Sequence, residues 1–169
     1  MSNVIVGNKT ALVSSLLEQL AYQWPLSPNQ EIIRLETQSS PIDLIQALSS
    51  QTQSPKLYWG DRESPFKIAA FGAILDLKGL NNAHFESDLA KIKSFLPKNN
   101  PNFRFFGGRR FSSVDSAEKE STWQHFGFYR FILPEFEWRE ENGTTYFACY
   151  IKNDPQKSVS DYQSEIESL

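Results

Sequence analysis

Apolar residues near the N-terminus recur at the three- and four-residue spacing of an amphipathic helix. They are Leu12, Val13, Leu16, Leu17, Leu20 and Ala21. Asn8 or Thr10 is available to cap this helix, and Pro25 and Pro28 should end it. The sequence therefore predicts one helix over residues 12–21, before the two prolines.

Two further segments combine a helix start with a stripe of apolar side chains. Ser40 is placed to cap a helix, Pro41 suits its first turn, and Asp43 favours the positive end of the helix dipole. The buried side of this helix should be Ile42, Leu44, Ile45 and Leu48. Asn81 or Asn82 should cap the later helix, which ends before the prolines that follow it. Its apolar stripe is Phe85, Leu89, Ile92, Phe95 and Leu96.

Six apolar runs have the length and composition of strands. They are Ile32–Glu36, Lys56–Asp61, Phe66–Leu77, Phe103–Phe111, Phe126–Trp138 and Thr144–Lys152. Gly72 lies inside the third run and should let another part of the chain approach closely. A polar loop over residues 112–121 joins the fourth run to the fifth. Asn142 and Gly143 are a strong hairpin signal and should join the last two strands.

The order of these elements predicts an α+β fold. A helix followed by two strands occurs over residues 42–77 and again over 84–138, so we interpret the chain as repeated α-β-β units. The sheet should be mostly antiparallel, with the helices on its outer face. In the long strand that ends at Trp138, both alternating sets of side chains are apolar, as Phe131 and Ile132 illustrate. One face of the sheet would meet the helices, and the other would need a partner.

Length and composition fit a single globular domain. A chain of 169 residues should bury about 70% of the surface that it exposes when unfolded. The fractions of hydrophobic residues (40%) and of aromatic residues (14%) support a packed core and argue against disorder. We assign residues 1–153 to the α+β domain. Residues 154–169 form a polar tail, either a linker or the beginning of another helix.

The net charge and the cysteine content limit the kinds of partner and the cellular compartment that fit this sequence. The net charge of −3 gives no electrostatic reason to expect nucleic acid as a partner. Cys149 is the single cysteine, so no internal disulfide forms, and its apolar strand favours a core residue over a nucleophile. The start of the chain lacks the pattern of a signal peptide, and the longest apolar run, 68–75, is too short to span a bilayer. We therefore predict a cytoplasmic protein with no membrane association.

Gly107, Gly108, Arg109 and Arg110 form a segment with the chemistry of an anion site. Backbone N–H groups and paired guanidinium groups are suited to holding an anion. The same residues also fit a glycine bulge that lets a sheet bend or pack closely, with the arginines solvated or paired to acids. We favour the bulge, because the spacing matches neither a phosphate-binding loop nor a dinucleotide fingerprint.

The other polar candidates favour structural roles. Asp61, Arg62 and Glu63 lie together at a strand end, which is typical of a charged turn. His84 and His125 have no Cys, Asp or Glu at zinc-ligand spacing. A Ser-His-Asp arrangement would be possible in principle, but no nucleophile-elbow motif accompanies it. The residues alone therefore indicate no catalytic constellation.

A set of motifs in fixed order carries a family resemblance. The central block reads FFGGRRF at 105–111, then a Trp and a Phe at 123 and 126, then RFILPEFEW at 130–138. Upstream, IIRLE precedes PIDLIQAL, followed by KLYWGDRE and FKIAAFGAI. Over about residues 30–150, this series resembles the N-terminal part of isochorismate synthases, within the wider family of chorismate-using enzymes.

The resemblance implies a role in converting chorismate to isochorismate with bound Mg²⁺. The products would feed menaquinone or phylloquinone, or salicylate and siderophore synthesis. In the family the catalytic lysine, the catalytic glutamate and the glutamates that hold the metal lie in the larger C-terminal part, so no catalytic, cofactor-binding or metal-binding residue carries over to this chain. The residues of the family motifs would instead shape the scaffold. They are Tyr58, Trp59, Arg62, Gly72, Gly107, Gly108, Phe111, Trp123, Phe126, Leu133 and Pro134.

We therefore expect a fragment of an isochorismate synthase that is inactive alone. Its partner would be the missing C-terminal catalytic part, from the same gene or a separate chain, and its uncovered sheet face should favour self-association. The alternative is a non-enzymatic module that binds a small molecule or another subunit, although IIRLETQSS departs from the ligand motif of anthranilate-forming relatives. If the chain does convert chorismate, Glu63, Lys67, Arg109 and Glu135 are the first residues to substitute.

Overall fold

The protein folds into two compact units, each built on an antiparallel sheet. The computed structural model describes residues 3–28, 30–63, 65–96, 100–110 and 126–167. The first unit consists of Met1–Gly72 and Glu135–Leu169, and the second of Ala73–Pro134. All strand pairings found among the described residues are antiparallel, which confirms the predicted α+β class.

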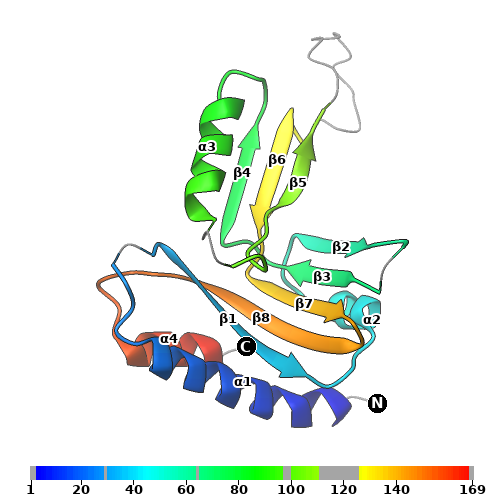
Figure 1. Ribbon diagram of the computed structural model, residues 1–169, viewed down its shortest axis with the longest axis vertical. Coiled ribbons are helices and arrows are strands. Elements are labelled where there is room, and N and C mark those ends of the chain that lie inside the picture. The colour runs from blue at the N-terminus through cyan, green and yellow to red at the C-terminus, as the bar shows by residue number, and fades with distance from the viewer. Residues whose placement is uncertain (1–2, 29, 64, 97–99, 111–125, 168–169) are drawn as a thin grey trace. The chain divides into compact units, whose positions relative to one another are not determined.

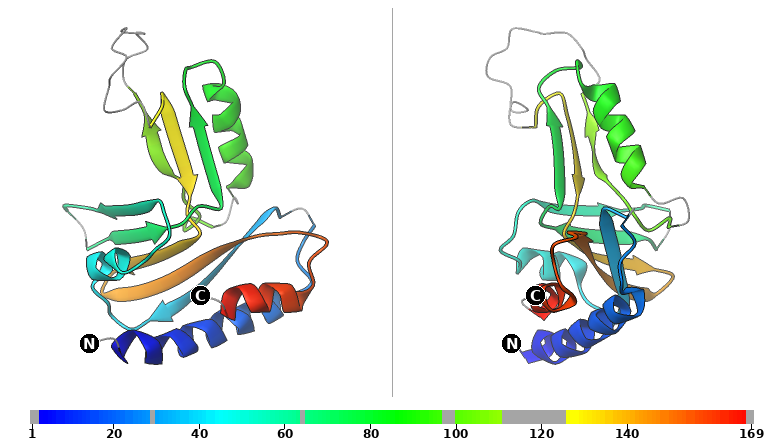
Figure 2. Two further views of the ribbon diagram at one scale, coloured as in Figure 1. Left: turned by 180° about the vertical axis from the view of Figure 1, so that it is seen from behind. Right: turned by 90° about the vertical axis from the view of Figure 1, so that its left-hand side faces the viewer.

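A five-stranded sheet forms the centre of the first unit, in the order β1-β8-β7-β3-β2 (Figure 1). Its strands are β1 (Ile32–Ser39), β2 (Lys56–Gly60), β3 (Lys67–Phe71), β7 (Phe136–Glu141) and β8 (Thr144–Lys152). The helices α1 (Asn3–Gln23) and α4 (Val159–Glu167) lie against one face of this sheet, while α2 (Leu44–Ser49) contacts β3 (Figure 2).

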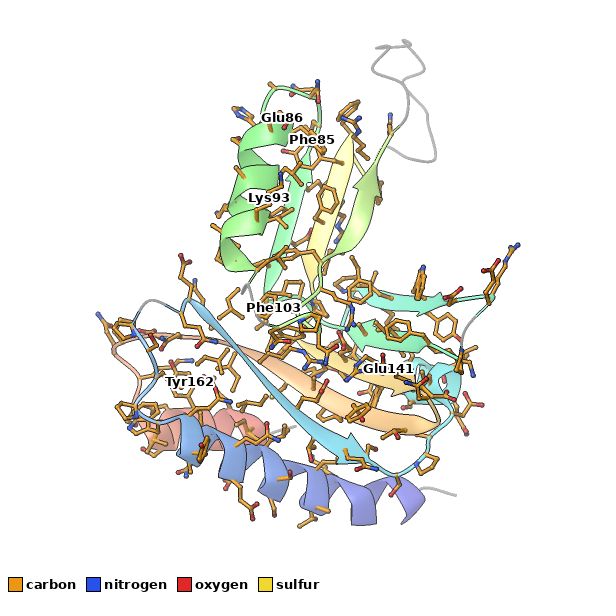
Figure 3. The ribbon with its side chains drawn as sticks, viewed as in Figure 1. Phe85, Glu86, Lys93, Phe103, Glu141 and Tyr162 are labelled. Atoms are coloured by element: carbon orange, nitrogen blue, oxygen red, sulfur yellow. The ribbon has the colours of Figure 1, made fainter. Side chains whose placement is uncertain are left out.

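The second unit pairs a three-stranded sheet with one helix. The strands are β4 (Leu75–Gly79), β5 (Phe106–Arg109) and β6 (Tyr129–Leu133), in the order β4-β6-β5. Phe85, labelled in Figure 3, is the first residue of α3 (Phe85–Phe95). The ring centroid of Phe85 lies 5.2 Å from that of Tyr129 and 6.4 Å from that of Phe131. The helix α3 therefore packs on the face of β6 that carries these two rings.

Successive side chains along each strand point to opposite faces of the five-stranded sheet, and the two faces differ in composition. The helix-facing side chains form one core with α1, α2 and α4, in which Leu16, Ile33, Leu35 and Tyr162 are fully buried. On β7, Phe136 and Trp138 join this core, while Glu137 and Arg139, which alternate with them, point to the opposite face. The helices therefore cover one face, as the sequence predicts, but the other face of β7 is charged rather than apolar.

Two predicted strands are wrong in the same way, because each is divided between the two sheets. The run Phe66–Leu77 becomes β3 and β4, and the run Phe126–Trp138 becomes β6 and β7. The first break falls at Gly72, whose φ is +68° and where a Cβ atom would lie 2.7 Å from Oε2 of Glu135. This confirms the predicted close approach, and the positive φ explains why the strand cannot continue.

The second break falls at Pro134, directly before the point where the chain returns to the first sheet. Proline has no N–H group to donate to a strand ladder. The next residue, Glu135, donates its N–H to the carbonyl of Phe71 at 3.2 Å and thereby starts the pairing of β7 with β3. The two breaks therefore lie side by side, where the chain leaves and re-enters the first unit.

The predicted helix caps are wrong at all three helices. α1 begins at Asn3, so Asn8 and Thr10 lie inside it. Asp43, not Ser40, caps α2 by accepting hydrogen bonds from the N–H groups of Ile45 and Gln46, both at 3.0 Å. Ile45, predicted to be buried, is exposed.

The N-cap of α3 lies two residues after Asn82 and three after Asn81, the two predicted caps. His84 occupies the N-cap position, whereas Asn81 accepts a hydrogen bond from the N–H of Ala83 at 2.9 Å and so closes the preceding turn. At its other end the helix stops at Phe95, and Leu96, predicted to be buried, is exposed.

The hairpin turn, the strands β1, β5 and β8, and the C-terminal tail can each be compared with their predicted bounds. The hairpin turn is confirmed, with φ of 51° at Asn142 and 76° at Gly143, and β8 has the predicted bounds. β1 continues three residues beyond its predicted end, and β5 is shorter than predicted. The tail contains α4, which carries Tyr162 (Figure 3) and in which Tyr162 and Ile166 are both buried. Across the described part of the chain, no helix is long and apolar enough to cross a bilayer.

Candidate functional site

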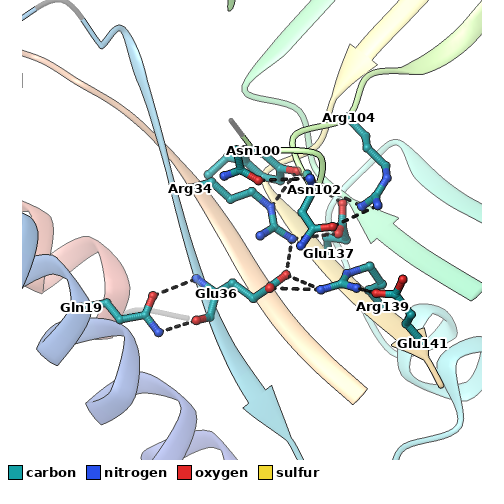
Figure 4. Close-up of polar contacts among 10 residues, drawn as sticks. Gln19, Arg34, Glu36, Asn100, Asn102, Arg104, Glu137, Arg139 and Glu141 are labelled. Atoms are coloured by element: carbon teal, nitrogen blue, oxygen red, sulfur yellow. Dashed lines mark hydrogen bonds and ion pairs between the residues drawn. The ribbon is translucent and has the colours of Figure 1, made fainter. Parts of the chain in front are cut away.

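A group of charged and polar residues, most of them buried, lies on the face of the first sheet that is turned away from its helices (Figure 4). Arg34 and Glu36 come from β1, Glu137 and Arg139 from β7, and Tyr150 from β8. These five residues are called the polar cluster below. The side chain of Glu137 is 0% exposed, and those of Arg34 and Arg139 are 4% and 3% exposed, so the charges are largely removed from water.

Glu36 is the residue that links the two arginines. Nη2 of Arg34 lies 2.5 Å from Oε2 of Glu36, and Nη2 of Arg139 lies 3.0 and 3.1 Å from its two oxygens. Arg139 also pairs with Glu141 through its other terminal nitrogen. One carboxylate on β1 is therefore held by guanidinium groups from both β1 and β7.

Glu137 completes the cluster from the other side. Nη2 of Arg34 lies 3.1 Å from its Oε1, and the hydroxyl of Tyr150 donates to its Oε2 at 3.4 Å. On the intervening strand β8, Ala148 is the register partner of both Glu36 and Glu137. Because alanine is small, side chains from β1 and β7 can meet above β8.

Gln19 of α1 ties the edge strand of the sheet to its covering helix. Its side-chain oxygen accepts a hydrogen bond from the N–H of Glu36 at 3.0 Å, and its NH₂ group donates to the carbonyl of the same residue. The side-chain amide thus satisfies backbone groups of an edge strand that would otherwise remain available for pairing. Glu36 is consequently fixed through both its backbone and its side chain.

The electrostatics of the polar cluster favour fixed charges over proton transfer. Burial alone would raise the pKa of Glu36, but hydrogen bonds and charges from Arg34 and Arg139 hold that pKa below its ordinary value. A general acid or base works best with a pKa near the working pH. The arrangement therefore suits the alignment of β1, β8 and β7 rather than acid-base catalysis.

The segment from Gly107 to Arg110 shows the close packing that the preferred interpretation requires, but no bulge. β5 pairs with β6 in unbroken register from Phe106 to Arg109. A Cβ atom on Gly107 would overlap the carbonyl oxygen of Arg130, so this glycine lets the two strands approach. The guanidinium carbon of Arg109 lies 4.9 Å from the ring centroid of Phe85, on the side of the sheet that packs against α3.

The motif residues of the first unit lie at its edge and in a turn. Tyr58 and Trp59 belong to the edge strand β2 and are 45% and 49% exposed. Arg62 lies with Asp61 and Glu63 in the exposed turn between β2 and β3, where Asp61 accepts a hydrogen bond from the N–H of Glu63 at 3.1 Å. This is the charged turn that the sequence predicts.

The later motif residues are mostly interior. Leu133 and Pro134 are fully buried, and Phe126 is half-buried. Phe111 and Trp123 lie outside the described residues, as does His125. The described motif residues therefore belong to both units.

Neither Cys149 nor the described acidic residues form a reactive or metal-binding group. Cys149 is 2% exposed, and burial raises the pKa of its thiol to about 12, so the nucleophilic thiolate is disfavoured. Within the described ranges, no group of three or more His, Cys, Asp or Glu residues is placed to hold a metal ion. Glu36 and Glu137 are engaged by guanidinium groups, so the polar cluster does not fit Mg²⁺, which prefers free carboxylate oxygens.

The polar cluster is not among the sequence-based predictions. The sequence does contain a pattern that indicates it, because charged residues occupy alternating positions inside the apolar strand segments IIRLE and FEWRE. Alternation of this kind places such residues on one face of a sheet. Their mutual contact depends on the order β1-β8-β7, which the sequence does not reveal.

Comparisons with known proteins point to the same family as the motifs. Isochorismate synthase 2 (chloroplastic) of Arabidopsis thaliana is 28% identical over 127 residues, covering 75% of this chain and 21% of that protein. Chloroplastic isochorismate synthase of Catharanthus roseus is 30% identical over 109 residues, covering 64% of this chain and 18% of that protein. The chain therefore spans about a fifth of the length of these relatives.

A solved structure shares the fold. The menaquinone-specific isochorismate synthase MenF of Escherichia coli superposes with a TM-score of 0.59 over 92% of this chain and 32% of that one, at 16% identity. The family profile described as "Chorismate binding enzyme" matches residues 18–169, which include both sheets and α4. The chain belongs to the chorismate binding enzyme family.

Proposed function

We propose that this chain is the N-terminal scaffold portion of an isochorismate synthase and does not convert chorismate by itself. The observation that carries the proposal is the MenF fold, which covers 92% of this chain while the chain spans 32% of that enzyme. The polar cluster supports a scaffold role, because its carboxylates are committed to ion pairs that fix three strands. In the assembled enzyme, Mg²⁺ would be held by carboxylates of the catalytic portion, as the family resemblance implies.

An assay of chorismate conversion tests this proposal. The purified chain is incubated with chorismate and Mg²⁺, the products are separated by chromatography, and MenF serves as the active control. We expect no isochorismate from the chain, provided that circular dichroism shows it to be folded. Isochorismate formed by the chain alone would overturn the proposal, and Glu63, Lys67, Arg109 and Glu135 would then be substituted first.

The edge strand β2 supports a second role as an interaction module. Its exposed side chains include Tyr58 and Trp59, and an edge strand presents unpaired backbone groups to another strand. We propose that the catalytic portion, from the same gene or a separate chain, pairs along this edge. Without it, self-association through β2 is the expected substitute.

Light scattering over a range of concentrations tests that role. The wild-type chain should increase in mean mass with concentration, and Trp59→Lys should remain monomeric because a charge opposes edge pairing. Lys9→Ala, at an exposed position of α1, is the control and should behave as wild type. A wild-type chain that stays monomeric at high concentration would count against the proposed surface.

The cellular location is a separate proposal. We propose a reducing, cytoplasmic environment, which the single buried cysteine supports. The two plant relatives are named as chloroplastic proteins. Fractionation of the source cells, with the chain detected by antibody, would decide between these compartments.

A further inference from the structure

The adjacent glycines of β5 differ in what the fold requires of them. A Cβ atom on Gly107 would overlap the backbone of Arg130, whereas a Cβ atom on Gly108 would meet no heavy atom of the described residues within 4 Å. Close strand packing therefore explains the first glycine but not the second. A strand glycine often marks a place where a ligand approaches the backbone.

Positively charged residues surround Gly108 on one face of the three-stranded sheet. The register places Gly108 beside Arg130, and Arg130 beside Lys78. Directly paired residues of antiparallel strands share a face, so these three positions form one row. Arg110 follows two residues after Gly108, and its N–H donates to the carbonyl of Phe128 at 2.8 Å, which continues the ladder and places Arg110 on the same face.

This row lies on the side of the sheet opposite α3. Phe85 of α3 contacts Tyr129 and Phe131, which flank Arg130 along β6 and point the other way. The guanidinium group of Arg130 forms two hydrogen bonds with Asp76, at 2.9 and 2.6 Å. Asp76 therefore orients Arg130 within this row.

Arg110 adds an unsatisfied donor to this face. Its Nε atom is buried and has no hydrogen-bond partner in the described structure. A buried donor without an acceptor costs free energy, and an oxyanion would supply the acceptor. Guanidinium groups bind carboxylate and phosphate oxygens through charge-assisted hydrogen bonds that are stronger than neutral ones.

We propose that Gly108, Arg110 and Arg130 form a binding site for a small doubly charged oxyanion, either a phosphate or a dicarboxylate. Gly108 provides access to the backbone, Arg110 provides the donor that lacks an acceptor, and Arg130 is held in place by Asp76. Lys78 adds a further positive charge to the row. The site is independent of the proposed scaffold function, because it requires neither chorismate nor a catalytic partner.

Titration with inorganic phosphate and with succinate, at constant ionic strength set by KCl, tests the site. Amide chemical shifts of residues 106–110 should change and saturate with at least one of the two anions. Arg110→Gln should weaken binding about tenfold, as expected for the loss of one charge-assisted hydrogen bond. Gly108→Ala should also weaken binding, because its methyl group fills the approach to the backbone.

Two controls make the result specific. Lys91→Gln removes one positive charge from an exposed position of α3 and should bind as wild type. Gly108→Ala should retain the wild-type thermal midpoint, because its Cβ has open space. Tighter binding of phosphate or of succinate would identify the ligand class. Shifts that do not saturate with either anion, wild-type affinity in Gly108→Ala or Arg110→Gln, or an unfolded Gly108→Ala would overturn the proposal.

Discussion

Glu36 shows how a single side chain can specify the pairing of distant strands. Its carboxylate accepts hydrogen bonds from Arg34 on its own strand and Arg139 on β7, and its backbone is held by Gln19 of α1. A buried ion pair gives little net stability compared with an apolar contact, but a mismatched pairing would leave buried charges without partners. We therefore assign to Glu36 a role in selecting the strand arrangement.

The lowered pKa of Glu36 predicts a specific form of acid lability. Arg34 and Arg139 bind the ionised form in the folded protein, so the folded pKa lies below the unfolded value of about 4.5. The stability gained from this group is fully present above that unfolded value and is lost as the pH falls through the folded pKa. Urea unfolding measured from pH 7 down to pH 3 should follow this loss.

Glu36→Gln provides the direct comparison for that measurement. The variant should lose about 1.5–3 kcal/mol at pH 7, the usual contribution of a hydrogen bond to a charged group, and should depend less on pH below 4.5. Glu18→Gln, at an exposed position of α1, should retain the wild-type profile. Equal profiles for all three proteins would show that the polar cluster does not contribute to folding stability.

Among the elements, α4 shows that polar composition does not exclude a place in the core. Only two of its side chains, Tyr162 and Ile166, are buried, and they are four positions apart on one face of the helix. The hydroxyl of Tyr162 accepts a hydrogen bond from the N–H of Asp154 at 2.6 Å and donates to the carbonyl of that residue at 3.1 Å. The helix is therefore attached through both apolar contact and hydrogen bonds.

Ile166→Ala should destabilise the protein because it leaves a cavity under α4. The expected loss is about 2–5 kcal/mol, the usual range for truncating a buried isoleucine to alanine. Chemical denaturation monitored by tryptophan fluorescence measures it. Ser164→Ala, on the exposed side of the same helix, should change stability little. A loss no greater than that of Ser164→Ala would mean that α4 does not pack on the rest of the first unit.

At the scale of the whole molecule, the second unit is an insertion into the first. The chain leaves at Gly72 and returns at Glu135, and the flanking residues Phe71 and Phe136 are register partners in the first sheet. Insertions are tolerated where the two chain ends lie close together. Among the residues that the structure describes, none from the inserted segment belongs to the core cluster that includes Phe71 and Phe136.

Replacing Ala73–Pro134 with a short glycine-rich turn should therefore leave a folded first unit. We expect a cooperative thermal transition and slow hydrogen exchange in β8, which is paired on both sides. Adding Leu35→Ala to the shortened chain should lower the transition, because Leu35 is fully buried in the remaining core. A shortened chain that shows no cooperative transition would indicate that the first unit requires the insertion.

The accuracy of the sequence-based predictions depends on the range of the interactions involved. The turn at Asn142 and Gly143 and the bounds of β8 are correct, because local conformational preferences decide them. The predicted caps of α1, α2 and α3 are wrong because several polar residues near each helix start could act as the N-cap. Packing of the helix against the rest of the protein decides where the helix begins. The polar cluster was not predicted because its members lie about a hundred residues apart in the chain.

The sequence by itself determined the α+β class, the existence of most elements and the family, because periodicity and motifs are properties of neighbouring residues. Only the tertiary structure decided that each of two apolar runs would contribute one strand to each of the two sheets. Gly72 and Pro134 permit those breaks, but the pairing of Phe71 with Phe136 makes them stable. Two other long-range pairings, of β8 with β1 and of β8 with β7, bring the charges of β1 and β7 together above Ala148. Each of these outcomes depends on contacts between distant segments, which a pattern along the chain does not specify.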